Sequence, residues 1–303
     1  MSATRCTDAT RRHDFKLVFD VVDGNPNGDP DACNMPRIDP ETMQGLVTDV
    51  AIKRRVRNWV AATRDCQAPW RIYVQNHGIA LNRLHQEAYD ALAIKPTGTR
   101  QRRQDVDQTR RWMCEQFYDI RTFGAVMTTG VNCGQVRGPV QLGMARSVDP
   151  IAVLDLAITR VAVTREHAGD DESGPDAAVS GRTIEMGRKP CVPYGVYVAC
   201  GSVSPLFARS TGFGDGDLTL LWEALTRTWD HDRSASRGIM SCRGLYVFSH
   251  ASAHGDAPAH ALLDRVQIRR RDAGAVARRF EDYDTLVDRS DLHPDVELTT
   301  LGA

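Results

Sequence analysis

A strand that runs into an irregular loop and then into a helix is the feature that most limits what this chain can fold into. Phe15–Val22 (FKLVFDVV) is mostly apolar and rich in the β-branched and aromatic residues that favour a strand. Asp23–Asp31 (DGNPNGDPD) follows directly, and its two Gly, two Pro and two Asn predict an irregular loop. Beyond it, Ile52, Val56 and Trp59 lie on one helical stripe, which predicts an amphipathic helix.

Further apolar segments predict the remaining elements. The predicted strands cover residues 119–128, 140–146, 151–163, 192–203 and 245–249, and the predicted helices cover residues 106–116 and 218–229, the latter capped by Asp215 or Asp217. Residues 165–190 are polar and Gly-rich, which predicts an exposed loop or a mobile hairpin. This order fits an α+β fold with a ferredoxin-like or RRM-like core better than a doubly wound sheet, in which strands and helices alternate strictly.

The overall composition limits the classes of function. The length of 303 residues is compatible with one elaborated domain or two small ones, and a single elaborated domain is predicted. Its 38 Lys and Arg against 39 Asp and Glu exclude a uniformly basic nucleic-acid binder, so an anion-binding surface requires local segregation of charge. There is no apolar run near the ~20 residues of a membrane span and no apolar stretch behind the N-terminus, which favours a cytoplasmic protein. The eight cysteines are dispersed without a CxxC pair, so no zinc site is predicted.

Basic residues gather on the first predicted helix. Lys53, Arg54 and Arg57 are expected to point away from its apolar stripe, and the run from Ala51 to Arg64 has almost no neighbouring acids. Cations that contact phosphates release condensed counterions, so this face favours nucleic-acid binding over a merely solvated surface. The basic stretches 100–111 and 265–279 are open to both interpretations, a phosphate path or an exposed loop.

The loop after the first strand offers two kinds of chemistry. Asn25 and Asn27 can hydrogen-bond a phosphate or a sugar, although a plain connection rich in turn formers explains the composition equally well. Clustered carboxylates are able to hold Mg²⁺ for phosphodiester cleavage, but Asp is also an ordinary turn residue. The carboxylates in question are Asp23, Asp29, Asp31 and Asp39. No sequence motif supports nucleophilic catalysis, and neither a metal site nor a cofactor is predicted.

Three segments resemble the backbone subunit of the type I-C CRISPR surveillance complex called Cascade, a member of the RAMP superfamily. They are FDVVDGNPNGDPDACNMPRIDPETMQGLVTDVAIKRRVRNWV, DIRTFGAVMTTGVNCGQVRGPVQLGMARSVDPI and KPCVPYGVYVACG. The resemblance implies an RRM-like palm with finger and thumb insertions. Its expected parts are a palm over 14–77 and 191–250, a finger-like insertion and central strands over 78–150, a thumb over 164–190 and a C-terminal extension over 251–303.

In that family several copies polymerise head to tail along one CRISPR RNA and present it for pairing with target DNA in antiviral defence. The resemblance implies further partners: an end-capping RNA-processing subunit, a large and a small subunit, and a recruited helicase-nuclease. It implies neither a cofactor nor contact with a membrane. Met186 would be the wedge that displaces a base, and Arg137 sits beside Gly138, where a phosphate could approach. The residues expected to bind RNA are Asn25, Asn27, Lys53, Arg54, Arg57, Arg121, Gln135, Arg137, Arg182, Met186 and Lys189.

Two alternatives stand beside this non-enzymatic interpretation. Related backbone subunits of type III complexes cut target RNA with an acidic loop residue, so a metal-dependent ribonuclease would use Asp29 or Asp31. A stand-alone RRM-like RNA binder would form no filament.

Overall fold

A computed structural model describes residues 5–75, 78–96, 101–160 and 185–302, and an antiparallel sheet lies at its centre. The strand order is β14-β11-β1-β10-β8-β4, and β7 also pairs with β10. The strands of this sheet are β1 (His13–Gly24), β4 (Gln44–Val47), β7 (Val140–Leu142), β8 (Ala145–Pro150), β10 (Glu185–Val203), β11 (Ile239–His250) and β14 (Val296–Leu301).

Two helices complete the core of the fold. α1 (Asp49–Thr63) follows β1, and α6 (Asp215–His231) lies between β10 and β11. In chain order the core therefore reads β1, α1, β8, β10, α6, β11, and the spatial order β11-β1-β10-β8 is that of a ferredoxin-like βαββαβ unit. The α+β prediction is confirmed, as are the opening strand and the helix, with Ile52, Val56 and Trp59 buried as expected. The loop predicted over Asp23–Asp31 is irregular only at residues 25–27, because its other residues belong to β1, to a short strand and to a 3-10 turn.

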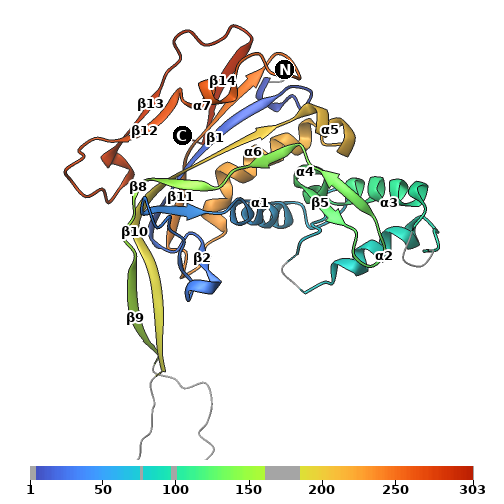
Figure 1. Cartoon of the computed structure of the whole chain (residues 1–303), viewed down its shortest axis with the longest axis horizontal. Coiled ribbons are helices and arrows are strands. Elements are labelled where there is room, and N and C mark those ends of the chain that lie inside the picture. Colours follow the sequence, from blue (N-terminus) through green and yellow to red (C-terminus); the bar gives the residue numbers. More distant parts are fainter. Residues whose placement is uncertain (1–4, 76–77, 97–100, 161–184, 303) are drawn as a thin grey trace, which may run out of the picture.

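The two faces of the sheet are covered by different parts of the chain (Figure 1). Side chains alternate along β1, so Phe15, Leu17 and Phe19 pack against the α1 and α6 side, whereas Val18 belongs to the cluster on the opposite face. That opposite face is covered by a C-terminal layer made of α7 (Ala259–Leu263), β12 (Val266–Arg270) and β13 (Tyr283–Val287).

The C-terminal layer buries the aromatic side chains of the sheet. Tyr194, Tyr246 and Phe248 are buried in one cluster with Leu262 and Tyr283 of the layer. The sheet is therefore a middle layer, and these aromatic residues are not left at its surface.

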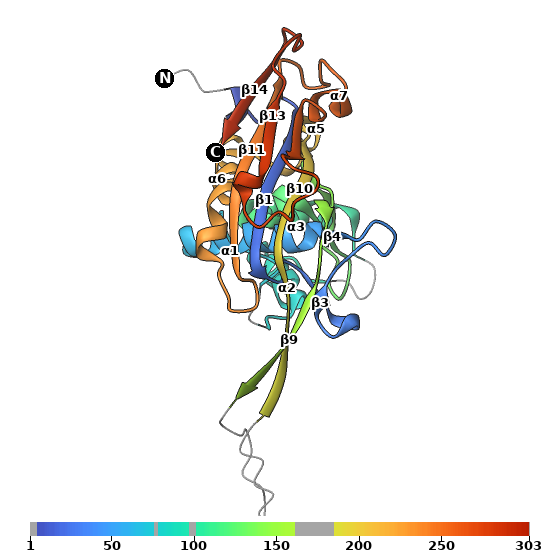
Figure 2. The ribbon, with the colours of Figure 1, turned by 90° about the vertical axis from the view of Figure 1, so that its left-hand side faces the viewer.

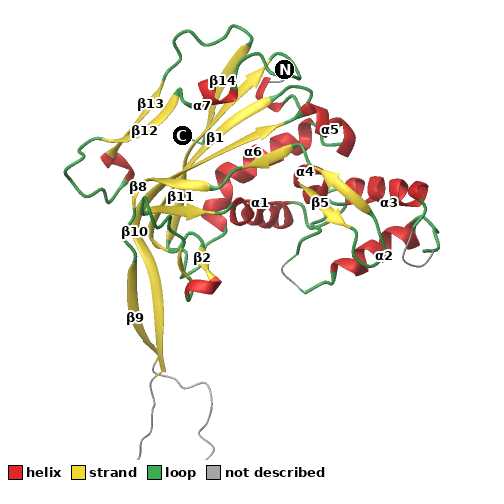
Figure 3. Cartoon of the chain, in the orientation of Figure 1, coloured by secondary structure: helices red, strands yellow, loops and turns green. Residues whose placement is uncertain are grey.

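An insertion between α1 and β7 forms a second, smaller core beside α1 (Figure 3). Its elements are α2 (Leu81–Ala91), α3 (Arg103–Gln116), α4 (Tyr118–Phe123), β5 (Gly124–Met127) and β6 (Gly134–Arg137). The predicted strand over 119–128 is wrong in its first half, which forms α4. All six residues of α4 are buried, its polar ones included, and a short segment that is buried all round has no periodicity to distinguish helix from strand.

A two-stranded ribbon extends away from the sheet (Figure 2). β9 (Leu154–Arg160) pairs with the first part of β10, from Glu185 to Cys191. The loop predicted over 165–190 is therefore strand from Glu185 onward, and its remainder lies outside the described residues. The strand predicted over 140–146 is divided into β7 and β8. A small hairpin of β2 (Gly28–Asp29) and β3 (Met35–Pro36) and the helix α5 (Pro205–Thr211) complete the fold.

Among the described residues, no helix combines the length and the apolar character that a membrane span requires.

Candidate nucleic-acid interface

The basic residues of α1 are mostly engaged inside the protein. Arg57 is only 9% exposed, and its Nε donates to Asp119 Oδ2 at 2.8 Å. The same carboxylate accepts the backbone N–H groups of Tyr73 and Val74, so this ion pair fixes the insertion to α1. Arg57 therefore does not form part of an open basic face, because an acidic partner from far away in the sequence covers it.

The neighbouring cations of α1 also have partners. Lys53 pairs with Asp49 one turn earlier at 2.7 Å. Arg54 donates to the carbonyl of Val74 at 2.7 Å, and burial, reinforced by the nearby Arg57 charge, lowers its pKa. Arg55 is buried against Asp232, and burial lowers its pKa to about 10, which leaves it charged at neutral pH. α1 therefore does not present an uncovered basic face.

Arg121 is buried as well. Its guanidinium donates to both carboxylate oxygens of Asp217, at 2.9 and 2.7 Å, and to the carbonyls of Pro69 and Cys114. A bidentate pair of this kind is a strong and geometrically specific contact. It holds α4 against the start of α6, so Arg121 is placed as a structural residue and not on an accessible surface. Asp217 also accepts the N–H of Gly214, as expected of a capping residue for α6.

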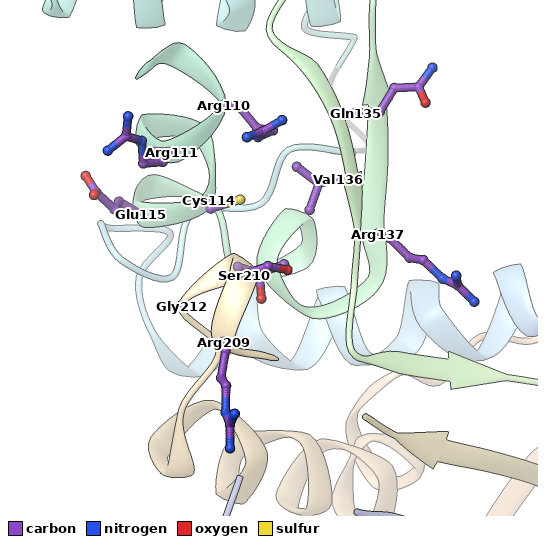
Figure 4. A pocket seen from close by; sticks show the side chains of 11 residues that line it. Arg110, Arg111, Cys114, Glu115, Gln135, Val136, Arg137, Arg209, Ser210 and Gly212 are labelled. Carbon is purple, nitrogen blue, oxygen red and sulfur yellow. The ribbon is translucent and has the colours of Figure 1, made fainter. Parts of the chain in front are cut away.

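Gln135 and Arg137 are exposed on β6, and both line a cavity of about 530 Å³. We call this cavity the α3–α5 cleft, because α3 supplies Arg110 and Arg111 and α5 supplies Arg209 (Figure 4). The guanidinium of Arg137 lies 4.3 Å from the ring centroid of Phe207, which fixes it at the junction of β6 and α5.

Cations outnumber acids in the α3–α5 cleft. Its lining holds four arginines and one acidic residue, Glu115. Arg110 pairs with Asp107 at 3.1 Å, whereas Arg137 and Arg209 have no carboxylate partner in the described part of the chain. Burial raises the pKa of the Cys114 thiol to about 11, so this wall is neutral at physiological pH. The cleft has the electrostatic character that attracts a phosphodiester strand.

Sequence patterns predict only part of this cleft. The family resemblance indicates Gln135 and Arg137, and the basic stretch that holds Arg110 and Arg111 is open to two interpretations. No pattern indicates Arg209, since it stands alone in the short helix α5 without a basic run around it. Backbone packing, and not the expected approach of a phosphate, explains why residue 138 is a glycine. A Cβ there would lie 2.3 Å from the carbonyl carbon of Phe123, so the glycine permits close backbone packing.

The two asparagines of the loop after β1 have different surroundings. Asn27 Oδ1 accepts hydrogen bonds from the backbone N–H and the hydroxyl of Thr48, the residue that caps α1. Asn27 therefore positions the start of the helix. Asn25 donates its Nδ2 to the carbonyl of Asn34, and both asparagines line a second, smaller cavity together with Arg54.

The residues predicted for the thumb fall on the β9–β10 ribbon or outside the described residues. Arg182 belongs to the latter group. Met186 pairs with Thr159 in the ribbon register and is 78% exposed. Lys189 pairs with Leu156 and lies on the opposite face, since successive residues of a strand alternate. Met186 and Lys189 therefore point to opposite sides of the ribbon.

The acidic residues of the first loop do not converge. Asp29 pairs with Arg37 at 3.0 Å, and Asp39 pairs with Arg146 at 2.7 Å, which lowers the pKa of Asp39. Within the ranges that the structure describes, no group of three or more His, Cys, Asp or Glu side chains is placed to hold a metal ion. His250 is buried and contacts Asp14 at 3.0 Å.

The chain thus combines an antiparallel α+β core with a cleft, between the insertion and α5, that is lined by four arginines. A family model described as CRISPR-associated protein Cas7 matches residues 11–288, so the chain belongs to the Cas7 family.

Individual relatives are more distant or match only in part. The CRISPR-associated protein Cas7 of Haloferax volcanii is 49% identical over 47 residues, which are 16% of this chain and 14% of that protein. A solved structure titled "CRISPR RNA-guided surveillance complex, pre-nicking" is 14% identical, with a TM-score of 0.48 over 82% of this chain and 79% of the other. A second, titled "CRISPR RNA-guided surveillance complex", is 16% identical, with a TM-score of 0.45 over 82% and 71%. The family assignment rests on the family model alone.

Proposed function

We propose that this chain is a CRISPR RNA-binding backbone subunit of a type I-C surveillance complex. The observation that carries the proposal is the α3–α5 cleft in a chain of the Cas7 family, where Arg137 and Arg209 have no acidic partner in the described part of the chain. Cations left uncovered in a cavity favour a ligand with regularly spaced negative charges. A single-stranded guide RNA is such a ligand.

In this role several copies bind side by side along one guide RNA. A head-to-tail contact between identical subunits produces an open helical assembly. The protein contacts fix the backbone and register of the guide, and base pairing with target DNA supplies the sequence specificity. The near-neutral net charge of −1 agrees with this arrangement, because only the groove along the RNA needs to be basic. The further partners are those of the complex: the end-capping RNA-processing subunit, the large and small subunits, and the recruited helicase-nuclease.

The proposed subunit does not cleave RNA. Support comes from Asp29, whose carboxylate is paired with Arg37 and also accepts the N–H of Asp31. The competing ribonuclease activity is tested with the guide-loaded complex, complementary RNA and Mg²⁺. Regularly spaced cuts that Asp29→Ala abolishes would overturn the non-catalytic role and leave RNA binding intact.

The covered sheet argues against a stand-alone RNA binder of the RRM type. Such modules stack bases on exposed aromatic residues of the sheet. Here three aromatic residues on the sheet face opposite α1 and α6, Tyr194, Tyr246 and Phe248, lie beneath the C-terminal layer. The surfaces available for RNA are therefore those of the insertion, the loops and the ribbon.

The direct test is to express the full chain with a guide transcript and purify it. We expect bound RNA, and oligomers whose size increases with the length of the RNA, measured by native mass spectrometry. A chain that stays monomeric and free of nucleic acid would contradict the proposal.

A further inference from the structure

A cavity of about 440 Å³ opens directly beside the α3–α5 cleft. The two cavities form one continuous depression, because their linings share Cys114, Glu115, Thr211 and Gly212 (Figure 4). We call this neighbouring part the Trp70 trough, since the half-buried side chain of Trp70 lines it. A strand that is held by the arginines of the cleft therefore lies next to the trough.

The Trp70 trough differs from the cleft in its charge. Arg121 lines it, but its guanidinium is engaged by both carboxylate oxygens of Asp217 and by two backbone carbonyls. Cys114 is neutral at physiological pH, because burial raises the pKa of its thiol to about 11. Glu115 stands at the border with the cleft and repels a phosphate. The trough therefore suits a neutral and largely apolar group, and phosphates are better placed beside the arginines of the cleft.

The indole of Trp70 is held in place by its surroundings. The guanidinium of Arg64 lies 5.6 Å from the centroid of its ring, and the ring packs at the edge of the main core. The backbone N–H of Trp70 donates to the carbonyl of Gln67 at 2.7 Å, which fixes the turn that carries it. Proteins bind unpaired bases with fixed aromatic side chains beside a cationic groove, because every base has an aromatic face that can stack.

Two glycines at the start of α6 keep the trough open. Gly214 and Gly216 line it, and a Cβ added at either position would meet no other part of the chain within 4 Å. Neither residue lies in the left-handed region of backbone conformation that favours glycine. Glycine is also less favourable than alanine within a helix, so the conformation of α6 does not explain Gly216. The absence of side chains at these positions leaves room for a ligand.

We propose that the Trp70 trough is a base pocket: one unpaired base of the strand in the α3–α5 cleft turns into it and stacks on Trp70, while the phosphates stay with the arginines. The volume of about 440 Å³ lies within the ~300–1,000 Å³ of cavities for drug-sized ligands, a size that includes a nucleoside. Stacking tolerates every base, so the pocket accepts a guide of any sequence. This inference rests on the proposed function and adds a second mode of contact to it.

The first arm of the test compares two fluorescent single strands of equal length, each bound by the full chain. One is RNA of mixed sequence, and the other has the same phosphates and riboses without bases. The phosphates of both strands can enter the cleft. We expect the RNA to bind about 5- to 150-fold more tightly than the baseless strand, the range that stacking of one base provides. Fluorescence anisotropy measures the dissociation constants.

The second arm fills or alters the trough. Gly216→Leu places an apolar side chain in the open space and is expected to remove most of the preference for RNA, while the affinity for the baseless strand is unchanged. Thr219→Leu is the matched control, because Thr219 is exposed on the same helix outside the trough, and it keeps the wild-type ratio of affinities. Trp70→Leu is expected to lose the preference and Trp70→Phe to keep most of it, since only phenylalanine retains a ring for stacking. Thermal unfolding shows whether each variant is folded.

The outcomes separate the base pocket from the proposed function. If the wild-type chain binds neither strand, the proposed function fails and this inference fails with it. If both strands bind equally, the proposed function stands and the base pocket is overturned, which leaves the trough to an apolar side chain of a neighbouring subunit. This comparison needs no variant to fold. A preference that persists in both Gly216→Leu and Trp70→Leu would place the bases elsewhere and overturn the role of the trough.

Discussion

Arginines in two regions of this molecule have opposite surroundings. In the interior, Arg57 and Arg121 are buried against Asp119 and Asp217. In the α3–α5 cleft, Arg137 and its neighbour Arg209 have no acidic partner among the described residues. A cluster of basic residues in a sequence is therefore not sufficient to identify a nucleic-acid surface. The position of the carboxylates in space decides which cations remain available to a ligand.

The largest effect is expected for Arg121→Met. This substitution leaves Asp217 buried without its cation, and breaking a buried pair in this way reduces the free energy of unfolding by about 3–5 kcal/mol. Chemical denaturation measures the change. The matched control is Arg137→Met in the cleft, where we expect a change within about 0.5 kcal/mol. If Arg121→Met and Arg137→Met lose the same free energy of unfolding, the distinction between the buried arginines and those of the cleft is wrong.

The second prediction concerns the cleft and its effect on binding. Arg137→Gln combined with Arg209→Gln is expected to weaken binding to single-stranded RNA while stability is retained. If both cations contact phosphates, the slope of log K against log salt becomes shallower by about 1.4, from ~0.7 per contact on a single strand. The slope is obtained by measuring the affinity for RNA at several salt concentrations.

A control for charge alone is available on the exposed side of α6 and just beyond it. Arg227→Gln with Arg233→Gln removes two exposed cations outside the cleft. We expect this variant to keep the wild-type slope. A slope that changes as much as in the cleft variant would indicate a general charge effect and contradict the assignment of the cleft.

The third prediction separates stability from binding by pH. Burial lowers the pKa of His13 and of His85 below the ordinary 6.5. The unfolded chain therefore binds protons that the folded chain does not, so stability is greatest above about pH 6.5 and falls as the pH drops below it. Each histidine contributes at most about 1.4 kcal/mol per pH unit. RNA affinity should stay constant over the same range, because arginines do not titrate there.

Denaturation at pH 7.5 and 5.5 tests this prediction, with His85→Gln as the variant that should show a shallower pH dependence. Carboxylates with lowered pKa values, such as Glu87 beside Arg71, lose their contribution only at more acidic pH. A chain that is equally stable at both pH values would contradict the prediction.

The smallest effect is expected for Lys53→Gln. Lys53 pairs with Asp49 one helical turn away, a contact worth about 0.3–0.5 kcal/mol. The stability change is therefore small. If Lys53 also reaches the guide, the salt slope becomes shallower by ~0.7. If the slope of log K against log salt is unchanged, Lys53 does not contact the RNA and belongs with Arg57 among the cations that are paired inside the protein.

Local patterns in the sequence predicted the core well. The alternating or continuous apolar runs of β1, β10 and β11 and the stripes of α1 and α6 were identified, because periodicity reflects burial on a face. The six buried residues of α4 carried no such period. The small strands of the C-terminal layer were not predicted either, since they depend on packing against a sheet formed by earlier parts of the chain.

The site was harder to predict than the fold. Gln135 and Arg137 were identified through a family resemblance, and the structure brings them together with Arg110 and Arg209. Arg57 was predicted to bind because no acid stands near it in the sequence, and Arg121 because it lies in a segment that resembles the family; their acidic partners are 62 and 96 residues away along the chain. Only the tertiary fold shows that these pairs meet.

The C-terminal layer has a consequence for synthesis on the ribosome. Chains emerge from their N-terminus, so β1, β10 and β11 are available before the residues that cover Tyr194, Tyr246 and Phe248. During that interval the nascent chain exposes a broad aromatic surface and lacks its edge strand β14. Slow translation just after β11 would prolong this vulnerable stage, and a chaperone that binds aromatic surfaces would protect the growing polypeptide until the closing strands appear.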